Sequence, residues 1–191
     1  MTFPQGERRL SIREAKPMPS RSAADRATDS LVRSATPADA ETICALVNAW
    51  ADEGLTLRRT PSEIENNIGE FVVAEVARDV SDDRSDSASI VACGALAVFS
   101  PSLAEIRSVA VDPASKGTGA GRRVVEFMLD IAHLLEMDEV CLLTKVPGFF
   151  ARFGFRTIEP SDLPASFLDE AIAGRGRTIA GRTVMLRELL G

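Results

Sequence analysis

The sequence contains no tyrosine, a single histidine (His133) and only three cysteines. A lone histidine excludes a histidine-based catalytic triad and a zinc site built from several histidines. We expect His133, which falls off the apolar stripe of its helix, to be solvated. The cysteines Cys44, Cys93 and Cys141 lie far apart in apolar segments and form no C-x-x-C pair. They are therefore predicted to be reduced core residues, with no metal site among them.

The sequence also lacks an apolar run long enough to cross a bilayer, and it lacks an excess of basic residues. Acidic residues outnumber basic ones by 28 to 22, for a formal net charge of −6. This balance argues against a nucleic acid or an anionic membrane as partner. With 191 residues, 45% of them apolar, the chain has the size of one domain with an appendage.

The appendage is predicted at the start of the chain, where residues 1–30 contain prolines, serines and arginines but few apolar residues. No apolar core of a secretory signal is present, and the acidic residues and prolines do not suit a transit peptide. We therefore expect a disordered tail over 1–30, a folded domain over 31–191, and a cytoplasmic protein.

A strand, a glycine-rich turn and a helix follow one another in the middle of the chain. β-Branched residues alternate over 106–111, Asp112-Pro113 ends that strand, and residues 116–121 read KGTGAG. Apolar residues then recur at helical spacing from Val125 onward. This arrangement presents free backbone N–H groups and a positive helix end to an anion, so we predict phosphate binding rather than a simple tight turn.

Two common phosphate motifs do not fit this turn. A P-loop requires a Lys-Ser/Thr pair directly after its last glycine, and none follows Gly121. A dinucleotide fingerprint requires a third glycine at the position that Arg122 occupies. The turn therefore belongs to another class of phosphate site.

The remaining pattern predicts a mixed order of strands and helices. Strands are expected over 31–36, 71–76, 90–99, 104–111, 139–144, from 155 and over 181–189, and helices over 36–54, from 60, after 121 and from 147. Polar residues 78–89 suggest an exposed hairpin loop. The strand at 139–144 should lie parallel to that at 104–111 across a right-handed crossover.

Two motifs in this order resemble those of the GCN5-related N-acetyltransferases (GNAT). Lys116, Gly119 and Gly121 fall on the acyl-CoA signature [R/Q]-x-x-G-x-[G/A], with lysine as a departure at the first place. Residues 149–155, FFARFGF, resemble the family's second marker, F-Y-x-x-x-G-F. The resemblance implies an α/β fold with a mixed α+β sheet, the GNAT acyl-CoA N-acyltransferase fold, in the order β-α-α-β-β-β-α-β-α-β-β.

Within this family the chain resembles the amino-acid acetyltransferases, the N-acetylglutamate synthases, in their short form without an amino-acid-kinase domain. The matching segments include LRRT at 57–60, FVVAE at 71–75 and AEI at 104–106. The resemblance implies transfer of an acetyl group from acetyl-CoA to the α-amino group of an amino acid, L-glutamate, for arginine biosynthesis. Another small amine or a protein N-terminus as acceptor, and a non-catalytic CoA-binding regulatory module, remain alternatives.

The resemblance also implies roles for particular residues. The donor would contact Val109, Val111, Lys116, Gly117, Thr118, Gly119, Ala120, Gly121, Arg122 and Phe150. No metal is expected, and a homodimer remains open.

Deprotonation of the acceptor requires a base, and Glu105 is the candidate. Period-two alternation predicts that Glu105, Arg107, Val109 and Val111 share the face lined by the donor. Two alternatives remain: a surface carboxylate paired with Arg107, and water as the base.

The absence of tyrosine bears on the leaving thiolate, because many family members protonate it with a tyrosine where this chain has Phe150. Val146 stands where some synthases place a serine, and Thr144 is a weaker substitute. We therefore predict protonation by solvent, since a thiol of pKa ~8.5 leaves tolerably without a dedicated acid.

An acceptor with two carboxylates calls for at least two cationic partners, and arginines suit this role best. The candidate acceptor-binding residues are Leu57, Arg58, Arg59, Arg107, Arg182 and Thr183. Lys145 is a further candidate, although an ordinary solvated lysine is the simpler interpretation.

Overall fold

The computed structural model describes residues 30–76 and 88–189. The expected tail, apart from Ser30, and most of the expected loop at 78–89 lie outside these residues. The described chain forms a seven-stranded sheet in the order β1-β2-β3-β4-β5-β7-β6, in which β4 and β5 are parallel and all other neighbours antiparallel. The strands are β1 (Leu31–Ser34), β2 (Phe71–Val76), β3 (Ser89–Val98), β4 (Leu103–Val111), β5 (Glu139–Thr144), β6 (Arg156–Thr157) and β7 (Thr183–Glu188). The predicted mixed α/β fold and the parallel pairing of β4 with β5 are confirmed.

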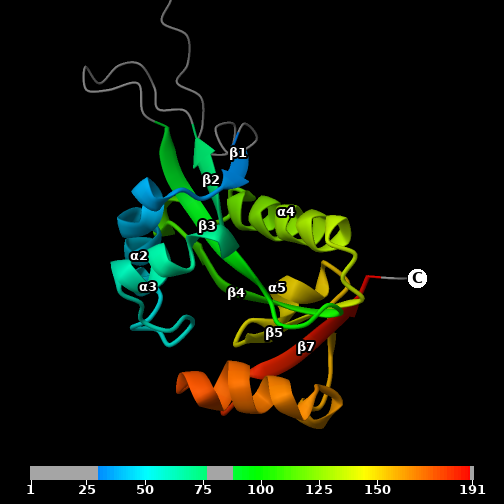
Figure 1. Ribbon diagram of the computed structural model, residues 1–191. Coiled ribbons are helices and arrows are strands. Elements are labelled where there is room, and N and C mark those ends of the chain that lie inside the picture. Colours follow the sequence, from blue (N-terminus) through cyan, green and yellow to red (C-terminus); the bar gives the residue numbers. More distant parts are fainter. Residues whose placement is uncertain (1–29, 77–87, 190–191) are drawn as a thin grey trace, which may run out of the picture.

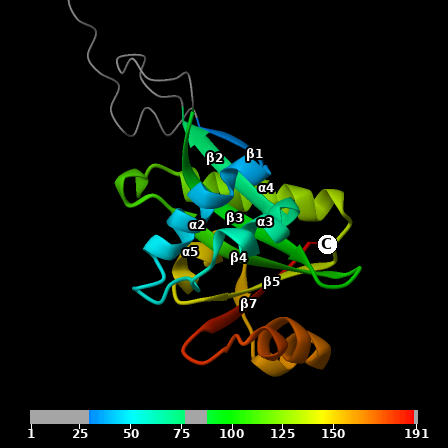
Figure 2. The same cartoon turned by 60° about the vertical axis from the view of Figure 1, so that its left-hand side comes forward.

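Helices cover both faces of this sheet (Figures 1 and 2). The α-helices are α2 (Ala40–Ala49), α3 (Pro61–Asn66), α4 (Ala120–Leu134) and α5 (Pro147–Ala151). The short helical segments are η1 (Pro37–Asp39), η2 (Ile68–Glu70), η3 (Pro113–Ser115), η4 (Pro160–Asp162), η5 (Phe167–Ile172) and η6 (Ala173–Arg175). The apolar stripe of α4 packs on one face through Val124, Val125 and Met128, whereas α2 packs on the other through Ile43 and Val47.

The three cysteines are free and buried, as predicted. Burial raises the pKa of the Cys93 thiol to about 12. His133 is exposed on α4, also as predicted. No described helix is long and apolar enough to cross a membrane, and no three His, Cys, Asp or Glu side chains in the described ranges gather as metal ligands would.

A bulge in β4 overturns the predicted alternation along this strand. Ala95 pairs with Arg107 and Cys93 with Ala110, so three steps of β4 oppose two steps of β3, and Ser108 takes φ 54°. The extra residue reverses the side-chain direction. Ala110 therefore packs toward α2, whereas Val109 and Val111 pack with Ile106 on the α4 side. Glu105 and Arg107 consequently do not share a face with Val109 and Val111.

β4 and β5 separate after Glu105, shortly before this bulge. They pair only from Leu103↔Glu139 to Glu105↔Cys141, although β4 runs on to Val111 and β5 to Thr144. On the side that faces β5, the backbone of β4 therefore has no neighbouring strand from Ile106 to Val111. Such an edge inside a sheet can pair with an extended ligand.

The segment between β6 and β7 contains helical turns that the sequence patterns did not predict. A π-helical stretch, η5, runs into η6, and Gly176 ends it in the left-handed region at φ 64°. Phe167 anchors the segment, because its ring is fully buried and meets the edge of Phe99 at a centroid distance of 5.2 Å. Burial of one aromatic ring thus fixes residues 167–177 against β5 and β7. The last strand is correspondingly shorter than expected.

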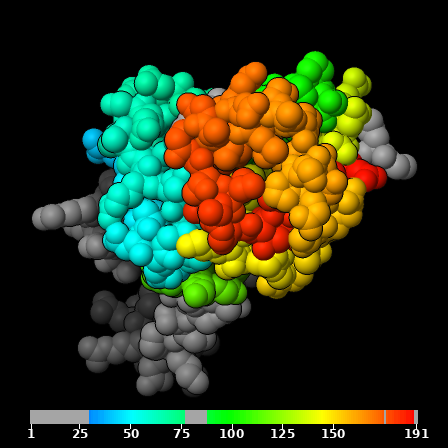
Figure 3. Space-filling model, turned by 90° about the horizontal axis from the view of Figure 1, so that it is seen from below, coloured from blue at the N-terminus to red at the C-terminus, as the bar shows by residue number. Residues whose placement is uncertain are grey.

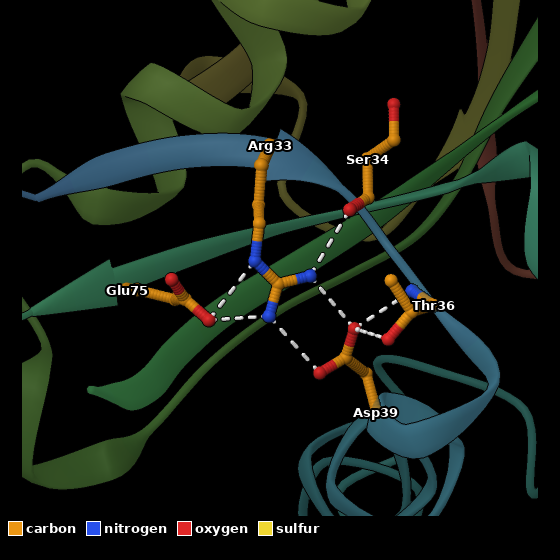
Figure 4. A network of polar contacts seen from close by, with 5 residues as sticks. All are labelled: Arg33, Ser34, Thr36, Asp39 and Glu75. Carbon is orange, nitrogen blue, oxygen red and sulfur yellow. Dashed lines mark hydrogen bonds and ion pairs between the residues drawn. The ribbon is translucent and has the colours of Figure 1, made fainter. Parts of the chain in front are cut away.

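Near the N-terminal end of the domain, Arg33 joins three elements (Figure 4). Its guanidinium donates to both carboxylate oxygens of Asp39, at 2.7 and 3.1 Å, and to the carboxylate of Glu75. Asp39 also accepts from the backbone N–H and hydroxyl of Thr36, which forms a capping box at the start of η1. These bonds hold β1 on β2 and fix the direction in which α2 leaves.

Candidate active site

A cavity of about 580 Å³ lies between the separating strands β4 and β5. Its wall combines the loop after α2, the last part of β4, the glycine turn, the end of β5 with α5, and the stretch before β7. Figure 3 shows the cyan segment after α2 beside the orange and red C-terminal segments. The cavity is therefore assembled from segments far apart in the sequence.

The glycine turn forms one end of the cavity. The residues of the turn that line it are Lys116, Gly117, Gly119, Ala120, Gly121 and Arg122, all of them among the predicted donor contacts. Gly119 lies at φ 90°, a conformation that favours glycine, and a Cβ on Gly121 would lie 2.8 Å from the Val111 side chain. Thr118 is not among the lining residues; its hydroxyl donates to the carbonyl of Ser115 at 2.6 Å. α4 begins directly behind this turn, so its N-terminal N–H groups face the same end of the cavity.

Trp50, the only tryptophan, links the loop after α2 to the end of β4. Its indole Nε1 donates to the carbonyl oxygen of Val111 at 2.7 Å, and Lys116 Nζ lies 5.6 Å from its ring centroid. The carbonyl of Val111, one of the two residues predicted to pair with the pantetheine of acetyl-CoA, is therefore already bonded to the indole. Val109 also lines the cavity.

The residues predicted to be near the leaving thiolate lie together in the cavity wall. Phe150 is buried, and its ring meets the edges of Phe149 and Phe155. Thr144 is also buried, and its hydroxyl accepts from the N–H of Val146 at 3.0 Å. Among these lining side chains only Thr144 offers an O–H group.

Glu105 is buried, with 2% of its surface exposed, and it pairs with Arg177. Arg177 donates from its two terminal nitrogens to the two carboxylate oxygens, at 2.8 and 2.5 Å, and also to the carbonyl of Ala171 at 3.2 Å. Burial lowers the pKa of Arg177, but its bonds to Glu105 more than offset this and leave that pKa raised. Arg177 lines the cavity, whereas Glu105 lies behind it.

This arrangement corrects the alternative interpretation of Glu105 as a surface carboxylate paired with Arg107. Arg107 forms its ion pair with Glu70 instead. Sequence reasoning missed Arg177 because the arginine lies 72 positions from Glu105, in a segment without periodic pattern. The signal that could have found it is Gly176 in the stretch GRGRT (residues 174–178), because this glycine ends a helical turn directly before Arg177.

The two arginines of the 57–60 motif have different environments. Arg58 is 65% exposed and pairs with Asp52 on the surface. Arg59 lines the cavity, and its guanidinium makes no hydrogen bond or ion pair with any residue in the described parts of the chain. Its burial, and then the charge of Arg107, lower its pKa.

Asn48 fixes the backbone of Arg59. Its Oδ1 accepts from the Arg59 N–H and its Nδ2 donates to the Arg59 carbonyl, each at 2.9 Å. The Cys44 thiol donates to the same carbonyl at 3.2 Å. α2 thereby holds one end of the loop that carries Arg59.

Arg182 holds the other end of this loop. Its guanidinium lines the cavity and donates to the carbonyls of Gly54 and Leu55, at 3.3 Å each. Burial, and then the charge of Arg177, lower its pKa. The remaining predicted acceptor residues differ in position: Leu57 lines the cavity, whereas Thr183 and Lys145 do not.

Six arginines line the cavity. Arg122 follows the glycine turn and pairs with Glu126, and Arg152 follows α5 and lies over the Phe149 ring. Of the other four, Arg107 and Arg177 have carboxylate partners, whereas Arg59 and Arg182 have none among the described residues. Buried cations that repel one another are costly unless an anion joins them. The cavity therefore has two places that could hold an anion, the backbone N–H groups of the glycine turn and the guanidinium groups of the opposite wall.

Comparison with known proteins agrees with this geometry. A family model described as an acetyltransferase (GNAT) domain matches residues 67–157. The amino-acid acetyltransferase of Mycobacterium tuberculosis is 36% identical over 140 residues, which cover 73% of this chain and 76% of the relative.

Two solved structures are similar along most of the described chain. The Mycobacterium tuberculosis protein Rv2747, in complex with CoA, superposes with a TM-score of 0.69 at 32% identity and covers 84% of this chain and 99% of its own. N-acetylglutamate synthase from Neisseria gonorrhoeae, complexed with CoA and N-acetyl-glutamate, superposes with a TM-score of 0.70 at 26% identity. That match covers 85% of this chain but 35% of the synthase, which is the longer protein.

Proposed function

This chain belongs to the GNAT family of acetyltransferases, and we propose that it transfers the acetyl group of acetyl-CoA to the α-amino group of an amino acid, L-glutamate. The relatives named amino-acid acetyltransferases, and the synthase structure with CoA and N-acetyl-glutamate, support this class of reaction. The observation that carries the proposal is the half-buried guanidinium of Arg59, without a carboxylate partner among the described residues, in the same cavity as the glycine turn.

The donor site follows from the glycine turn and the separated strands. The pyrophosphate would meet the N–H groups at Gly119 to Gly121 and the start of α4, with Lys116 as a nearby cation. The pantetheine amides would pair with β4 backbone that has no strand beside it. Because the Trp50 indole already bonds to the carbonyl of Val111, we place this pairing at Val109 and at the N–H of Val111.

The acceptor site follows from the guanidinium groups on the other side of the cavity. Arg59 is the first ligand that we propose for an acceptor carboxylate, with Leu57 beside it. A dicarboxylic acceptor fits the excess of cations better than a neutral amine or a peptide N-terminus does, since each carboxylate neutralises a buried charge. Glutamate is therefore the acceptor, and its product would serve arginine biosynthesis.

In the proposed reaction the acceptor ammonium first gives one proton to Glu105, directly or through water. The neutral amine then attacks the thioester carbon, a C–N bond forms, and the C–S bond breaks. The electron pair of the C–S bond leaves on the CoA thiolate, which takes a proton from solvent, and the new amide nitrogen gives its second proton to solvent. Thr144, whose buried side chain also lines the cavity, is the weaker alternative donor of that proton.

A thiol-release screen with acetyl-CoA and each of the twenty amino acids tests this proposal. Glutamate should give the fastest release, and N-acetylglutamate should be detected by mass spectrometry. Release with a peptide N-terminus or another amine alone would favour the second acceptor class, while CoA binding without release would mean a regulatory module.

A further inference from the structure

The ion pair between Glu105 and Arg177 occupies a position that the acceptor would need. Arg177 lines the cavity, yet both of its terminal nitrogens donate to Glu105. Glu105 is nearly inaccessible behind it. A carboxylate held in this way by two charge-assisted bonds is poorly placed to receive a proton from an ammonium group in the cavity.

We propose that Arg177 is a positioning residue that exchanges Glu105 for a carboxylate of the acceptor. When the acceptor carboxylate takes the terminal N–H groups of Arg177, the carboxylate of Glu105 is released toward the ammonium group. Glu105 thus acts first as an internal competitor for the acceptor and then as its base. This inference rests on the proposed function, because it requires an acceptor that carries a carboxylate.

The structure supplies the parts for such an exchange. Arg177 keeps a third anchor, the carbonyl of Ala171, so its side chain remains oriented while the carboxylate partner changes. Its backbone N–H bonds to the carbonyl of Ile172 at 2.8 Å, and Phe167 fixes that segment in the core. Arg59 and Arg182 lie in the same cavity wall and can hold a second carboxylate.

The exchange predicts that one variant binds glutamate more tightly than the parent does, although it removes a residue of the site. A protein that competes with its own ligand binds that ligand more weakly, in proportion to the fraction of molecules in which the site is free. Glu105→Gln removes the competing charge but keeps the shape, so it should bind glutamate more tightly while it loses turnover. We expect Kd for glutamate to fall on the order of tenfold, and kcat to fall on the order of a hundredfold.

The test is isothermal titration calorimetry of glutamate into the CoA-saturated protein. Glu70→Gln is the matched control, because it removes one negative charge from the other ion-paired arginine of the cavity, Arg107. Unchanged CoA affinity shows that each variant is folded. Glu105→Asp, whose shorter side chain reaches Arg177 less well, provides a second variant with the same expected direction.

Tighter glutamate binding by Glu105→Gln than by Glu70→Gln supports the exchange. An unchanged or weaker affinity, or a gain equal to that of Glu70→Gln, overturns it, since Glu105 would then orient Arg177 or act only through its charge. Absence of glutamate binding by the parent protein is a different result: it would contradict the proposed function itself.

Discussion

Two arginine clusters in this protein differ in the ratio of guanidinium groups to carboxylates. At the N-terminal end one guanidinium, that of Arg33, bonds to two carboxylates, and the network is complete (Figure 4). In the cavity wall Arg59, Arg107, Arg177 and Arg182 have two carboxylate partners between them, Glu70 and Glu105. The first cluster stabilises the fold, whereas the second, in the proposed function, is completed by the carboxylates of the acceptor. The balance of partners, not the number of arginines, separates a structural cluster from a binding site.

The largest effect is expected for Arg59, a half-buried cavity arginine without a carboxylate partner among the described residues. In the proposed site, Arg59→Leu removes a contact to the acceptor carboxylate. It should therefore cost about 2–5 kcal/mol in kcat/KM for glutamate and leave the KM for acetyl-CoA near that of the parent. Steady-state kinetics with each substrate varied in turn measures both quantities.

The neighbouring arginine supplies the control for this experiment. Arg58→Leu breaks an exposed pair with Asp52, which contributes little, and should leave kcat/KM within about twofold of the parent. Equal losses in the two variants, or a loss only in Arg58→Leu, would contradict the assignment of the unpaired arginine as the acceptor ligand.

The contrast between Arg58 and Arg59 also shows which features could be predicted from the sequence and which could not. Strand and helix order, the glycine turn and the parallel pairing of β4 with β5 follow from local patterns of apolar residues, glycine and proline, and these predictions are confirmed. Which of two adjacent arginines faces the cavity depends instead on Asn48, eleven positions away. No periodicity encodes such a bond.

Two further features were beyond sequence reasoning for physical reasons. The bulge at Ser108 adds one residue to β4 without a glycine or proline to mark it, so the predicted alternation of side chains failed there. The partner of Glu105 comes from a π-helical segment whose position depends on the burial of Phe167 rather than on local propensity. Tertiary packing decided both.

A smaller effect, on the free energy of unfolding, is expected in the cluster of Arg33, Asp39 and Glu75. Its bonds to Arg33 lower the pKa of Asp39 to about 2 from an ordinary value of 3.8. Because the folded-state pKa is the lower one, the ionised carboxylate stabilises the protein above pH ~4, and this contribution is lost as the pH falls toward 2. Asp39→Asn should therefore lower the free energy of unfolding by roughly 2 kcal/mol at pH 7.

Chemical denaturation of both proteins between pH 7 and pH 2 measures this difference. The difference in the free energy of unfolding between the parent and Asp39→Asn should become smaller as the pH falls. The kinetic constants of Asp39→Asn at pH 7 should be those of the parent. A gap that stays constant with pH would mean that Asp39 acts through the geometry of its cap at Thr36 rather than through its charge.

The smallest effect is expected for Asn48, which connects the fold to the unpaired arginine. Asn48→Ala removes two hydrogen bonds to the backbone of Arg59, worth about 1 kcal/mol each at most after solvent replaces them. The loop would still be held by Arg182, so Arg59 should be less well oriented rather than lost. We expect the KM for glutamate to rise roughly three- to tenfold. The kcat and the KM for acetyl-CoA should stay near the values of the parent.

Asn67→Ala is the matched control for Asn48→Ala, because Asn67 also donates to a backbone carbonyl, that of Glu63 at 2.8 Å, but lies at the end of α3 and away from the cavity wall. A general loss of stability would change both variants alike. A rise in the KM for glutamate confined to Asn48→Ala shows that the clamp acts through Arg59. Parent-like KM values in Asn48→Ala would mean that the cavity itself orients this guanidinium, and that the unpaired arginine needs no support from α2.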